Sequence, residues 1–232
     1  MRLLSAVCAL GVAIAAPVSA QVIENFEHGN EALYNQQTAG DNMSLTAASA
    51  HSGNFGAEFM TGTSGWRTRF DIPTSAGNQY FAYVRSRAPA NNGRVYFGVG
   101  ANAVGGTWSA VFGPNTNQIL LQNNTPTYGF VTAQSAAVPI TANIWYVLML
   151  DWAANGDMTV RLFDETMTTQ LAATPTHASG YTTPGGIALR GFTTAVAGAL
   201  PVIDIDDISI VPAPAAMLVL AGGLVPLARR RR

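Results

Sequence analysis

The acidic side chains of this 232-residue chain are most concentrated near its end, where Asp204, Asp206 and Asp207 lie within four positions. Paired carboxylates supply the acid and the nucleophile of glycoside hydrolysis, and in retaining enzymes they lie about 5–5.5 Å apart. The group here contains no Glu, and it falls on the last stretch that alternates apolar and polar residues, as a strand does. It therefore does not predict a catalytic pair.

A nucleophilic triad has little support either. The three histidines, His28, His51 and His177, all lie near predicted turns, where a lone histidine is usually solvated. The only cysteine, Cys8, lies in an apolar run at the N-terminus, and the chain has no Gly-x-Ser-x-Gly motif. The sequence favours a protein that is not an enzyme and whose mature chain has no disulfide or cysteine-bound metal.

Glycan binding requires exposed aromatic rings beside polar groups. The candidates are the aromatic residues in or next to predicted strands: Trp66, Tyr96, Trp108 and Tyr128. Strand alternation makes each of them equally compatible with the core, and the core is favoured for a Trp. Loops rich in Asn and Thr at 102–107, 114–118 and 122–127 suit the rim of a site or simple turns. The glycan-binding residues therefore stay unknown at this stage.

The charge of the chain argues against a nucleic-acid partner. Charged residues make up 11% of the sequence, and there is no lysine. Without Arg2 and the four arginines at the C-terminus, seven arginines remain against thirteen acids, which gives the central part a net charge of about −6. A nucleic-acid-binding protein would need a basic stripe, and the sequence has none.

A series of short stretches alternates or concentrates apolar residues between turns rich in Gly, Asn and Pro, which predicts strands. We expect strands at 22–27, 42–49, 55–60, 66–71, 79–87, 94–100, 108–112, 118–122, 128–133, 144–152, 158–164, 186–192 and 201–210. Stretch 144–152 is the most hydrophobic, and Asn155-Gly156 behind it signals a hairpin. The pattern predicts an all-β, two-sheet antiparallel sandwich.

The N-terminal residues are predicted to form a signal peptide. Arg2 precedes an apolar run from Leu3 to Ala16, and small residues occupy the positions three and one before Gln21. The run is too short for a transmembrane helix. We expect cleavage between Ala20 and Gln21 and export of the rest.

The C-terminal residues have three parts. Val211, Pro212, Ala213 and Pro214 form a stiff extended segment, because each Pro fixes its own φ and restricts the residue before it. Residues 215–228 carry no charged side chain, and the chain ends in four cations: Arg229, Arg230, Arg231 and Arg232. We expect a short membrane helix with the cations on the cytoplasmic side.

This C-terminal arrangement resembles the PEP-CTERM sorting signal of Gram-negative bacterial surface proteins. The family has Val-Pro-Glu-Pro before a short hydrophobic helix and an Arg-rich end, and Ala213 replaces the usual Glu here. The resemblance implies processing by an exosortase, a membrane-embedded cysteine transpeptidase, near the motif. A plain C-terminal anchor and a disordered tail are the alternatives.

The central part resembles the concanavalin A-like jelly roll of lectins, laminin-G-type domains and carbohydrate-binding modules. Residues 25–29, 50–59, 145–156 and 205–210 carry this likeness. The fold's glycoside hydrolases present Glu-x-Asp-x-x-Glu on one strand, a spacing that is absent from this sequence. The resemblance implies the fold, but its motifs are too degenerate to imply an activity.

The jelly-roll resemblance also implies a structural Ca²⁺ that joins the first strand to the last. Carried over by position, its side-chain ligands are Glu27 and Asp206, with Glu24 as a substitute for Glu27. Asp206 shares strand parity with Ile208 and Ile210, which would direct it inward. The alternative is that these acids lie at solvated strand ends.

Three segments follow from these observations: a signal peptide at 1–20, a β-sandwich at 21–210 and a sorting signal with a hydrophobic helix at 211–232. We expect an exported, non-enzymatic protein of the Gram-negative envelope, outer surface or extracellular matrix, transiently anchored in the inner membrane. Its expected partners are an exosortase, the membrane and a polysaccharide. An enzyme acting on polysaccharide and a purely structural matrix protein are the alternatives.

Overall fold

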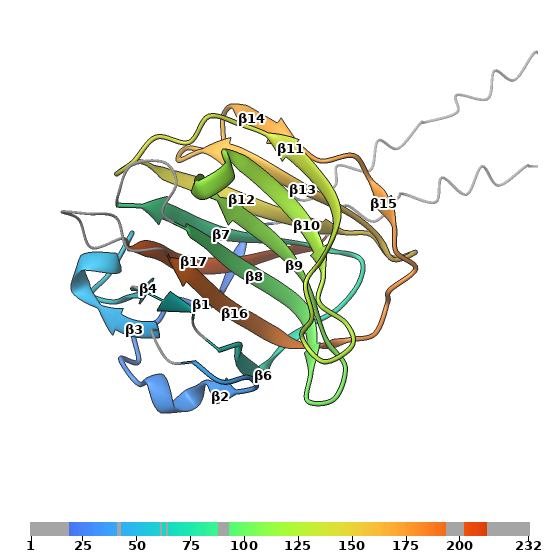
Figure 1. The fold of residues 1–232 in the computed structure, drawn as a ribbon, viewed down its shortest axis with the longest axis horizontal. Helices are drawn as coiled ribbons and strands as arrows, with labels where there is room; N and C mark the ends of the chain where they lie inside the picture. The colour runs from blue at the N-terminus through green and yellow to red at the C-terminus, as the bar shows by residue number, and fades with distance from the viewer. Residues whose placement is uncertain are drawn as a thin grey trace, which may run out of the picture.

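The structure is a computed structural model, and it describes residues 19–40, 43–60, 62–63, 65–87, 93–193 and 202–212. Within these residues, seventeen strands and three short 3-10 helices alternate along the chain, and no α-helix occurs. The strands form two antiparallel sheets that lie over one another as two layers (Figure 1). The predicted all-β, two-sheet sandwich is confirmed.

The sheet at the back of Figure 1 has nine strands in the order β14-β13-β12-β7-β17-β4-β3, with β1 on β17 and β15 on β13. Its members are β1 (Gln21–Glu24), β3 (Met43–Thr46), β4 (Gly56–Phe59), β7 (Asn78–Ser86), β12 (Trp145–Trp152), β13 (Asp157–Asp164), β14 (Gln170–Ala173), β15 (His177–Ala178) and β17 (Ile203–Pro212). The most hydrophobic stretch, now β12, lies inside this sheet between β13 and β7.

The sheet at the front has eight strands in the order β11-β10-β9-β8-β16-β6-β2, with β5 on β16. Its members are β2 (Asn35–Gln36), β5 (Gly62–Thr63), β6 (Arg67–Thr74), β8 (Gly93–Asn102), β9 (Gly106–Gly113), β10 (Gln118–Asn123), β11 (Val131–Ala137) and β16 (Gly185–Thr193). The 3-10 helices are η1 (Glu31–Leu33), η2 (Ala47–Ser49) and η3 (Pro114–Thr116).

The main core fills the space between the two sheets. Alternation along β8 sends Val95, Phe97 and Val99 into this core, and Leu148 and Leu150 of β12 meet them from the opposite sheet. All five side chains are fully buried. Each such side chain stabilises the fold by about 1.5–3 kcal/mol relative to an exposed one, so burial between the sheets is the main force that holds the sandwich together.

A second apolar cluster covers the outer face of the eight-stranded sheet. Its members come from four strands and two loops and pack separately from the main core: Trp66, Tyr96, Ala101, Val111, Leu120, Tyr128 and Ala188, with Phe192 against them. This sheet is therefore apolar on both faces, which the alternation pattern of a half-buried sheet would not show. The outer cluster positions the site described below.

The structure shifts two predicted strand boundaries. The first strand ends at Glu24 rather than at residue 27, because Phe26 has a left-handed φ of +59° that leaves the strand region. The strand expected at 128–133 begins only at Val131, because Thr127 and Tyr128 both have φ of +60°. Left-handed backbone at residues other than Gly is uncommon, so composition alone gave no sign of it.

Pro73 also lies inside a strand, where a strand end was expected. β6 continues to Thr74, while its outer neighbour β2 pairs only with Arg67 and Thr68. The later half of β6 is thus an edge, where a residue without an N–H group is tolerated. The predicted hairpin at Asn155-Gly156 is confirmed, since Gly156 has φ of +87° and β12 pairs with β13.

Candidate functional site

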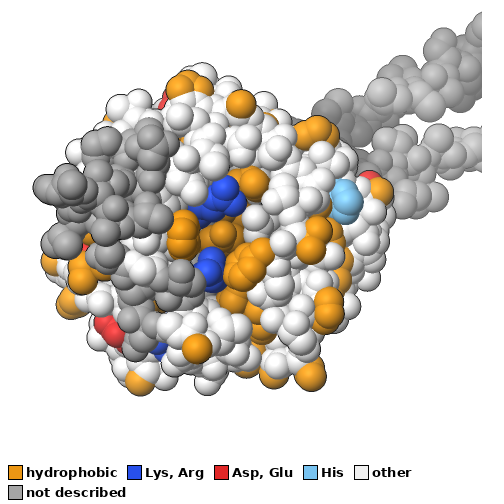
Figure 2. Space-filling view, viewed as in Figure 1, with side chains coloured by type: hydrophobic (Ala, Val, Ile, Leu, Met, Phe, Trp, Pro, Cys, Tyr) orange, Lys and Arg blue, Asp and Glu red, His pale blue; other side chains and the backbone are white. Residues whose placement is uncertain are grey.

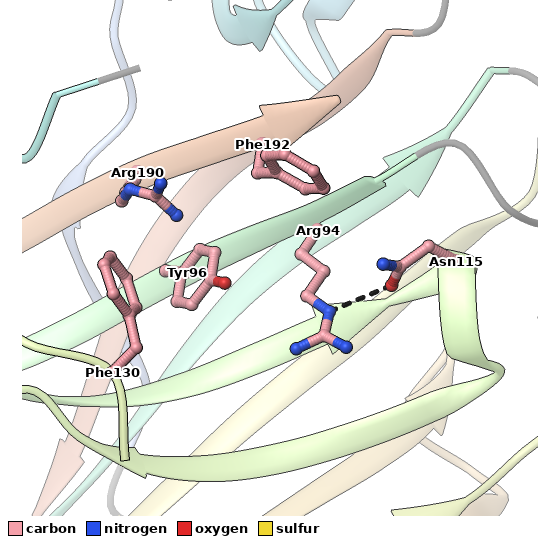
Figure 3. Close-up of a pocket in the computed structure, with 6 residues that line it drawn as sticks. All are labelled: Arg94, Tyr96, Asn115, Phe130, Arg190 and Phe192. Atoms are coloured by element: carbon pink, nitrogen blue, oxygen red, sulfur yellow. Dashed lines mark hydrogen bonds between the residues drawn. The ribbon is translucent and has the colours of Figure 1, made fainter. Parts of the chain in front are cut away.

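The candidate site is a hollow of about 290 Å³ on the outer face of the eight-stranded sheet. We call it the Arg–aromatic hollow, and six residues line it: Arg94, Tyr96, Asn115, Phe130, Arg190 and Phe192. Figure 2 shows this face of the molecule, with arginine side chains in a depression among hydrophobic ones. Figure 3 shows that the six side chains come from β8, β16, η3 and the loop before β11.

The floor of the hollow is built by two neighbouring strands. Tyr96 of β8 lies opposite Arg190 of β16, and Arg94 lies opposite Phe192. Cations and rings thus alternate both along each strand and across the pair, so the two arginines occupy diagonal positions. Diagonal neighbours in an antiparallel pair lie about 7–8 Å apart, a separation that two long arginine side chains can span together.

Gly191 explains why Arg190 and Phe192 can face the hollow. A Cβ atom at this position would lie 2.1 Å from Cγ of Phe59, a fully buried ring of β4 in the opposite sheet. Only a residue without a side chain leaves room for that ring against the back of β16. The sequence Arg190-Gly191-Phe192 therefore combines a tight inner face with two large outward side chains.

The guanidinium group of Arg190 is held against aromatic rings. It lies 4.4 Å from the ring centre of Phe130 and 5.1 Å from that of Tyr96 (Figure 3). Arg190 is only 8% exposed, and burial lowers the pKa of its guanidinium below the usual value. An arginine nonetheless keeps its charge in a protein, so the ring contacts fix a cation in place.

Arg94 is oriented by a short turn on the other side of the hollow. Its Nε donates a hydrogen bond of 3.0 Å to Oδ1 of Asn115. Asn115 belongs to η3, which begins at Pro114 and ends at Thr116, because the next residue, Asn117, has a left-handed φ of +49°. A bond from Nε leaves the two terminal nitrogens of the guanidinium free of that contact, so they remain directed at the hollow.

Phe130 stands on a loop that buried polar groups pin down. Asn124 is fully buried, and its Nδ2 donates to the Gly129 carbonyl at 2.6 Å. The hydroxyl of Tyr128 donates to the Asn102 carbonyl at 3.0 Å. Phe130 itself stacks at 6.3 Å on Trp66 but is 52% exposed. The loop thus holds a half-exposed aromatic ring on a firm base.

The hollow is positively charged within a domain of negative charge. Among the residues that the structure describes, no carboxylate forms an ion pair with Arg94 or Arg190. By contrast, Arg69, Arg85 and Arg87 each contact carboxylate oxygens at 3.1 Å or less. The missing partners are unusual, because arginine is seldom buried unless it is paired.

The four aromatic residues expected as candidate platforms are all buried, between 0% and 5% exposed: Trp66, Tyr96, Trp108 and Tyr128. Tyr96 lines the hollow, whereas Trp66 and Tyr128 support Phe130 from below. Trp108 faces the core between the sheets. None of the four is an exposed platform, because the second apolar cluster covers the three that do not face the core.

Of the three loops expected at a rim, one contributes a lining residue. Asn115 comes from the loop at 114–118, while the loop at 122–127 leads into Phe130. The loop at 102–107 lies at a different hollow of about 460 Å³, through Asn102 and Ala103. Arg94, Arg190 and Phe192 were missed, although Arg94 shares strand parity with Tyr96, and Arg190 with Phe192.

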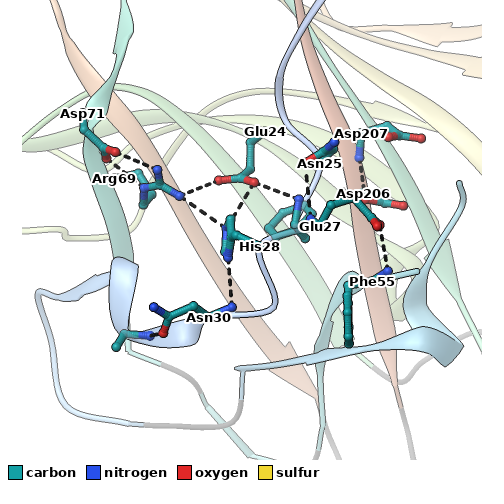
Figure 4. Close-up of polar contacts among 12 residues, drawn as sticks. Glu24, Asn25, Glu27, His28, Asn30, Phe55, Arg69, Asp71, Asp206 and Asp207 are labelled. Atoms are coloured by element: carbon teal, nitrogen blue, oxygen red, sulfur yellow. Dashed lines mark hydrogen bonds and ion pairs between the residues drawn. The ribbon is translucent and has the colours of Figure 1, made fainter. Parts of the chain in front are cut away.

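The expected metal ligands Glu27 and Asp206 both bind one loop, His51 to Phe55. Figure 4 shows the hydrogen bond from Phe55 to Glu27. Oε1 of Glu27 accepts hydrogen bonds from the backbone N–H groups of Asn54 at 2.6 Å and Phe55 at 2.9 Å, which lower its pKa. Oδ2 of Asp206 accepts from the N–H groups of His51 at 2.7 Å and Ser52 at 3.2 Å.

The backbone N–H groups of this loop are not ligands for a cation, because Ca²⁺ requires several oxygen ligands. Among the described residues, no group of three or more acidic, His or Cys side chains is arranged to hold a metal ion. The calcium site therefore stays a prediction from resemblance.

The parity argument for Asp206 is wrong. A register shift between Asp206 and Ser209, with Asp207 at a φ of +47°, adds a residue to β17. Ile208 consequently faces the core together with Ile205, while Asp206 faces away from it. Asp206 is fully buried under the loop at 51–55, and burial raises its pKa to about 7.

The remaining acids near the closing strand are also engaged. Asp204 is fully buried and contacts Nε of Arg85 at 2.8 Å and Nη2 of Arg87 at 2.7 Å. Asp207 contacts Nδ1 of His51 at 3.0 Å. None of the three acids lines the Arg–aromatic hollow. This cluster binds together strands and a loop, and it offers no free carboxylate pair to a substrate.

Glu24, named as the substitute metal ligand, lies in a separate ion-pair network (Figure 4). Arg69 joins it at 2.8 Å and joins Asp71 at 2.6 Å, and His28 lies 3.4 Å from its Oε1. Glu24 is 5% exposed, so the cation of Arg69 offsets the cost of its burial. The three histidines lie apart, since His51 stacks on Tyr83 and His177 packs beside Trp108.

Most of the two predicted terminal segments lies outside the described residues. Cleavage is expected between Ala20 and Gln21. Gln21 begins β1 and pairs with Ile210. Of the sorting motif, Val211 and Pro212 end β17. Ala213, Pro214 and the four terminal arginines are not described. No helix within the described part of the chain is long and apolar enough to cross a membrane.

Comparisons with known proteins identify the fold. No protein-family model and no curated protein matches the chain. Carbohydrate binding module CBM66 from Bacillus subtilis aligns with a TM-score of 0.56 and 8% identity, over 77% of this chain and 95% of that one. A Bacillus licheniformis β-glucanase aligns at 0.49 and 13%, over 85% and 99%, and peanut lectin at 0.49 and 11%, over 84% and 97%.

The chain therefore has the lectin-like jelly-roll fold that its sequence resembles. At these identities the likeness extends to the fold alone, because one fold carries many functions. The function therefore has to be argued from the hollow and its side chains.

Proposed function

We propose that this chain is an exported protein that binds carbohydrate in the Arg–aromatic hollow. The observation that carries the proposal is the ring of Phe130, 52% exposed and stacked on buried Trp66, beside Asn115 and two arginines. A sugar ring has one apolar face and a rim of hydroxyls. A fixed aromatic ring with polar side chains around it complements both of those features.

The likeness to CBM66, which is named a carbohydrate binding module, agrees with this proposal without carrying it. An enzyme acting on polysaccharide is the alternative. Hydrolysis would need a pair of carboxylates at the site. Among the described residues, the lining of the hollow includes no Asp or Glu, and Asp204 is held between two arginines elsewhere. These observations favour binding over hydrolysis.

The proposal also includes sorting to the cell surface or the extracellular matrix. It rests on the sequence: the predicted signal peptide at 1–20 and the PEP-CTERM-like segment at 211–232. An exosortase would act near Pro212 and Pro214, after export of the folded part. A surface or matrix location would place the hollow among polysaccharides.

The test is a binding measurement of the purified chain against a panel of polysaccharides and oligosaccharides. Phe130→Ala should weaken binding about 30-fold, because replacing an aromatic anchor by alanine costs about 2 kcal/mol or more. Phe70→Ala is the matched control, since Phe70 is 39% exposed on the same sheet but lines a different hollow. No binding to any saccharide, or equal losses in both variants, would contradict the proposal.

A further inference from the structure

The charge of the hollow indicates the chemical class of its ligand. Of the seven arginines between residues 21 and 210, Arg94 and Arg190 face one small hollow and have no carboxylate contact in the described residues. Elsewhere in this chain a partly buried arginine binds acids: Arg87, with a side chain 24% exposed, contacts Asp204 and Glu58. Within the described part of the chain, the hollow thus leaves positive charge without a counter-charge.

Keeping this positive charge buried costs free energy. A buried cation loses its hydration, and neighbouring rings compensate only part of the loss. Phe130 and Tyr96 hold the Arg190 guanidinium at 4.4 and 5.1 Å, but they do not neutralise it. An anion that enters the hollow would supply the missing charge. It would meet a guanidinium already fixed by stacking, so little side-chain entropy would be lost on binding.

The geometry limits the anion to a small planar group on a ring. A guanidinium presents paired N–H groups that match the two oxygens of a carboxylate. The hollow, at about 290 Å³, is at the small end of ligand pockets, which leaves space for about one or two sugar rings. Its exposed ring, Phe130, is adjacent to Arg190, so one sugar unit can stack and pair at once.

We propose that the Arg–aromatic hollow recognises a hexuronate unit of a polysaccharide, with the carboxylate on Arg190 and Arg94 and the sugar ring on Phe130. This inference rests on the proposed carbohydrate binding and names its ligand class. The domain's net charge of about −6 favours an acidic unit within an otherwise neutral chain over a polymer charged at every unit.

The experiment compares two ligands that differ in one group. The first is a neutral oligosaccharide that carries one glucuronate branch, and the second is the same molecule with its carboxyl group reduced to an alcohol. Calorimetric titration of the whole chain should give roughly 10- to 100-fold tighter binding of the carboxylated form, as expected for a charge-assisted hydrogen bond. This preference should decrease as the salt concentration rises.

Variants assign the preference to the hollow. Arg190→Gln and Arg94→Gln should each reduce the preference for the carboxylated ligand, and Arg190→Lys should restore it only in part, because lysine lacks the planar fork. Arg161→Gln is the control, since it removes the same charge from the other sheet, where Arg161 lies 3.5 Å from Asp151. Thermal melts verify folding, and Arg94→Gln, at a less buried position, keeps the test valid if Arg190→Gln does not fold.

The outcomes separate this inference from the proposed function. If neither ligand binds, and no other saccharide does, carbohydrate binding itself is contradicted. If both ligands bind equally, carbohydrate binding stands and the uronate assignment is overturned. A third ligand, with a sulfate ester on the reduced position, tests the choice of anion: equal binding of sulfate and carboxylate would overturn the assignment to a carboxylate. A preference that Arg161→Gln abolishes equally would also overturn it.

Discussion

Gly191 separates Arg190 from Phe192, and we expect Gly191→Ala to destabilise the whole protein. The added Cβ would lie 2.1 Å from Cγ and 2.2 Å from Cβ of Phe59, distances that real Cβ atoms essentially never show. Phe59 is fully buried in β4, and the atoms in contact include its Cβ rather than only the end of a flexible side chain. Relief therefore requires the ring, or β16 itself, to move.

The magnitude follows from the cost of overpacking a core, about 1–3 kcal/mol for one extra carbon. For a domain of this size, a change of 1 kcal/mol shifts the melting temperature by about 2–4 °C, so Gly191→Ala should lower it by roughly 2–12 °C. The shift is measured by thermal melts followed with circular dichroism. Because β16 carries Arg190 and Phe192, the same variant should also weaken saccharide binding.

A control and a double-mutant cycle make this prediction specific. Gly129→Ala, in the loop before β11, should leave the melting temperature unchanged, because the atom nearest to the added Cβ, the Pro126 carbonyl oxygen, lies at 3.6 Å. Phe59→Ala alone should cost about 3–5 kcal/mol, but in that background Gly191→Ala should cost almost nothing. A wild-type melting temperature for Gly191→Ala, or additive effects in the cycle, would refute the packing argument.

Four further predictions concern the acidic residues and the chain ends. Asp204→Asn should lower the free energy of unfolding by about 3 kcal/mol in urea titrations, because it leaves two partly buried arginines without their shared acid. The half-buried control Asp157→Asn should not. Because burial raises the pKa of Asp206 from 3.8 to about 7, the folded state binds more protons, and stability should fall as the pH rises from about 4 to 7. Asp206→Asn should make stability less dependent on pH in this range. An unchanged pH dependence would contradict the assignment of this effect to Asp206. Calcium binding at Glu27 and Asp206 predicts a higher melting temperature in millimolar Ca²⁺ than in chelator, and equal values would leave both as acceptors of N–H groups. Mass spectrometry of the protein from its native host should find Gln21 at the N-terminus and no Arg232, whereas retention of Arg232 would favour a plain anchor.

The sequence predicted the sandwich because strand signals are local. Alternation and turn residues mark β12, the Asn155-Gly156 hairpin and β13 without knowledge of the rest of the chain. The boundaries that failed depend on backbone angles, such as the left-handed φ of Tyr128 and of Asp207, which composition does not reveal. One such residue in β17 reversed the direction assigned to Asp206.

The candidate site was less predictable, because its members are distant in sequence. Arg94 and Arg190 become neighbours only through the pairing of β8 with β16. Whether an aromatic ring is exposed depends on what covers it: Trp66 is buried beneath Phe130, and residue type alone does not show which of the two is exposed. The missing carboxylate partners are a property of the folded surface and have no signal in the sequence.

The position of β17 determines how the sandwich would respond to a mechanical load. This ten-residue strand pairs with β7 on one side and with β4 and β1 on the other, and it ends at Pro212, directly before the predicted sorting segment. When the protein is tethered through that segment, tension on the tail enters at β17 and runs along the strand. The hydrogen bonds to β7 and β4 then share the force in shear, and extraction of the strand requires many of them to break together. The hollow, on the other sheet, would keep its shape while the tether is pulled.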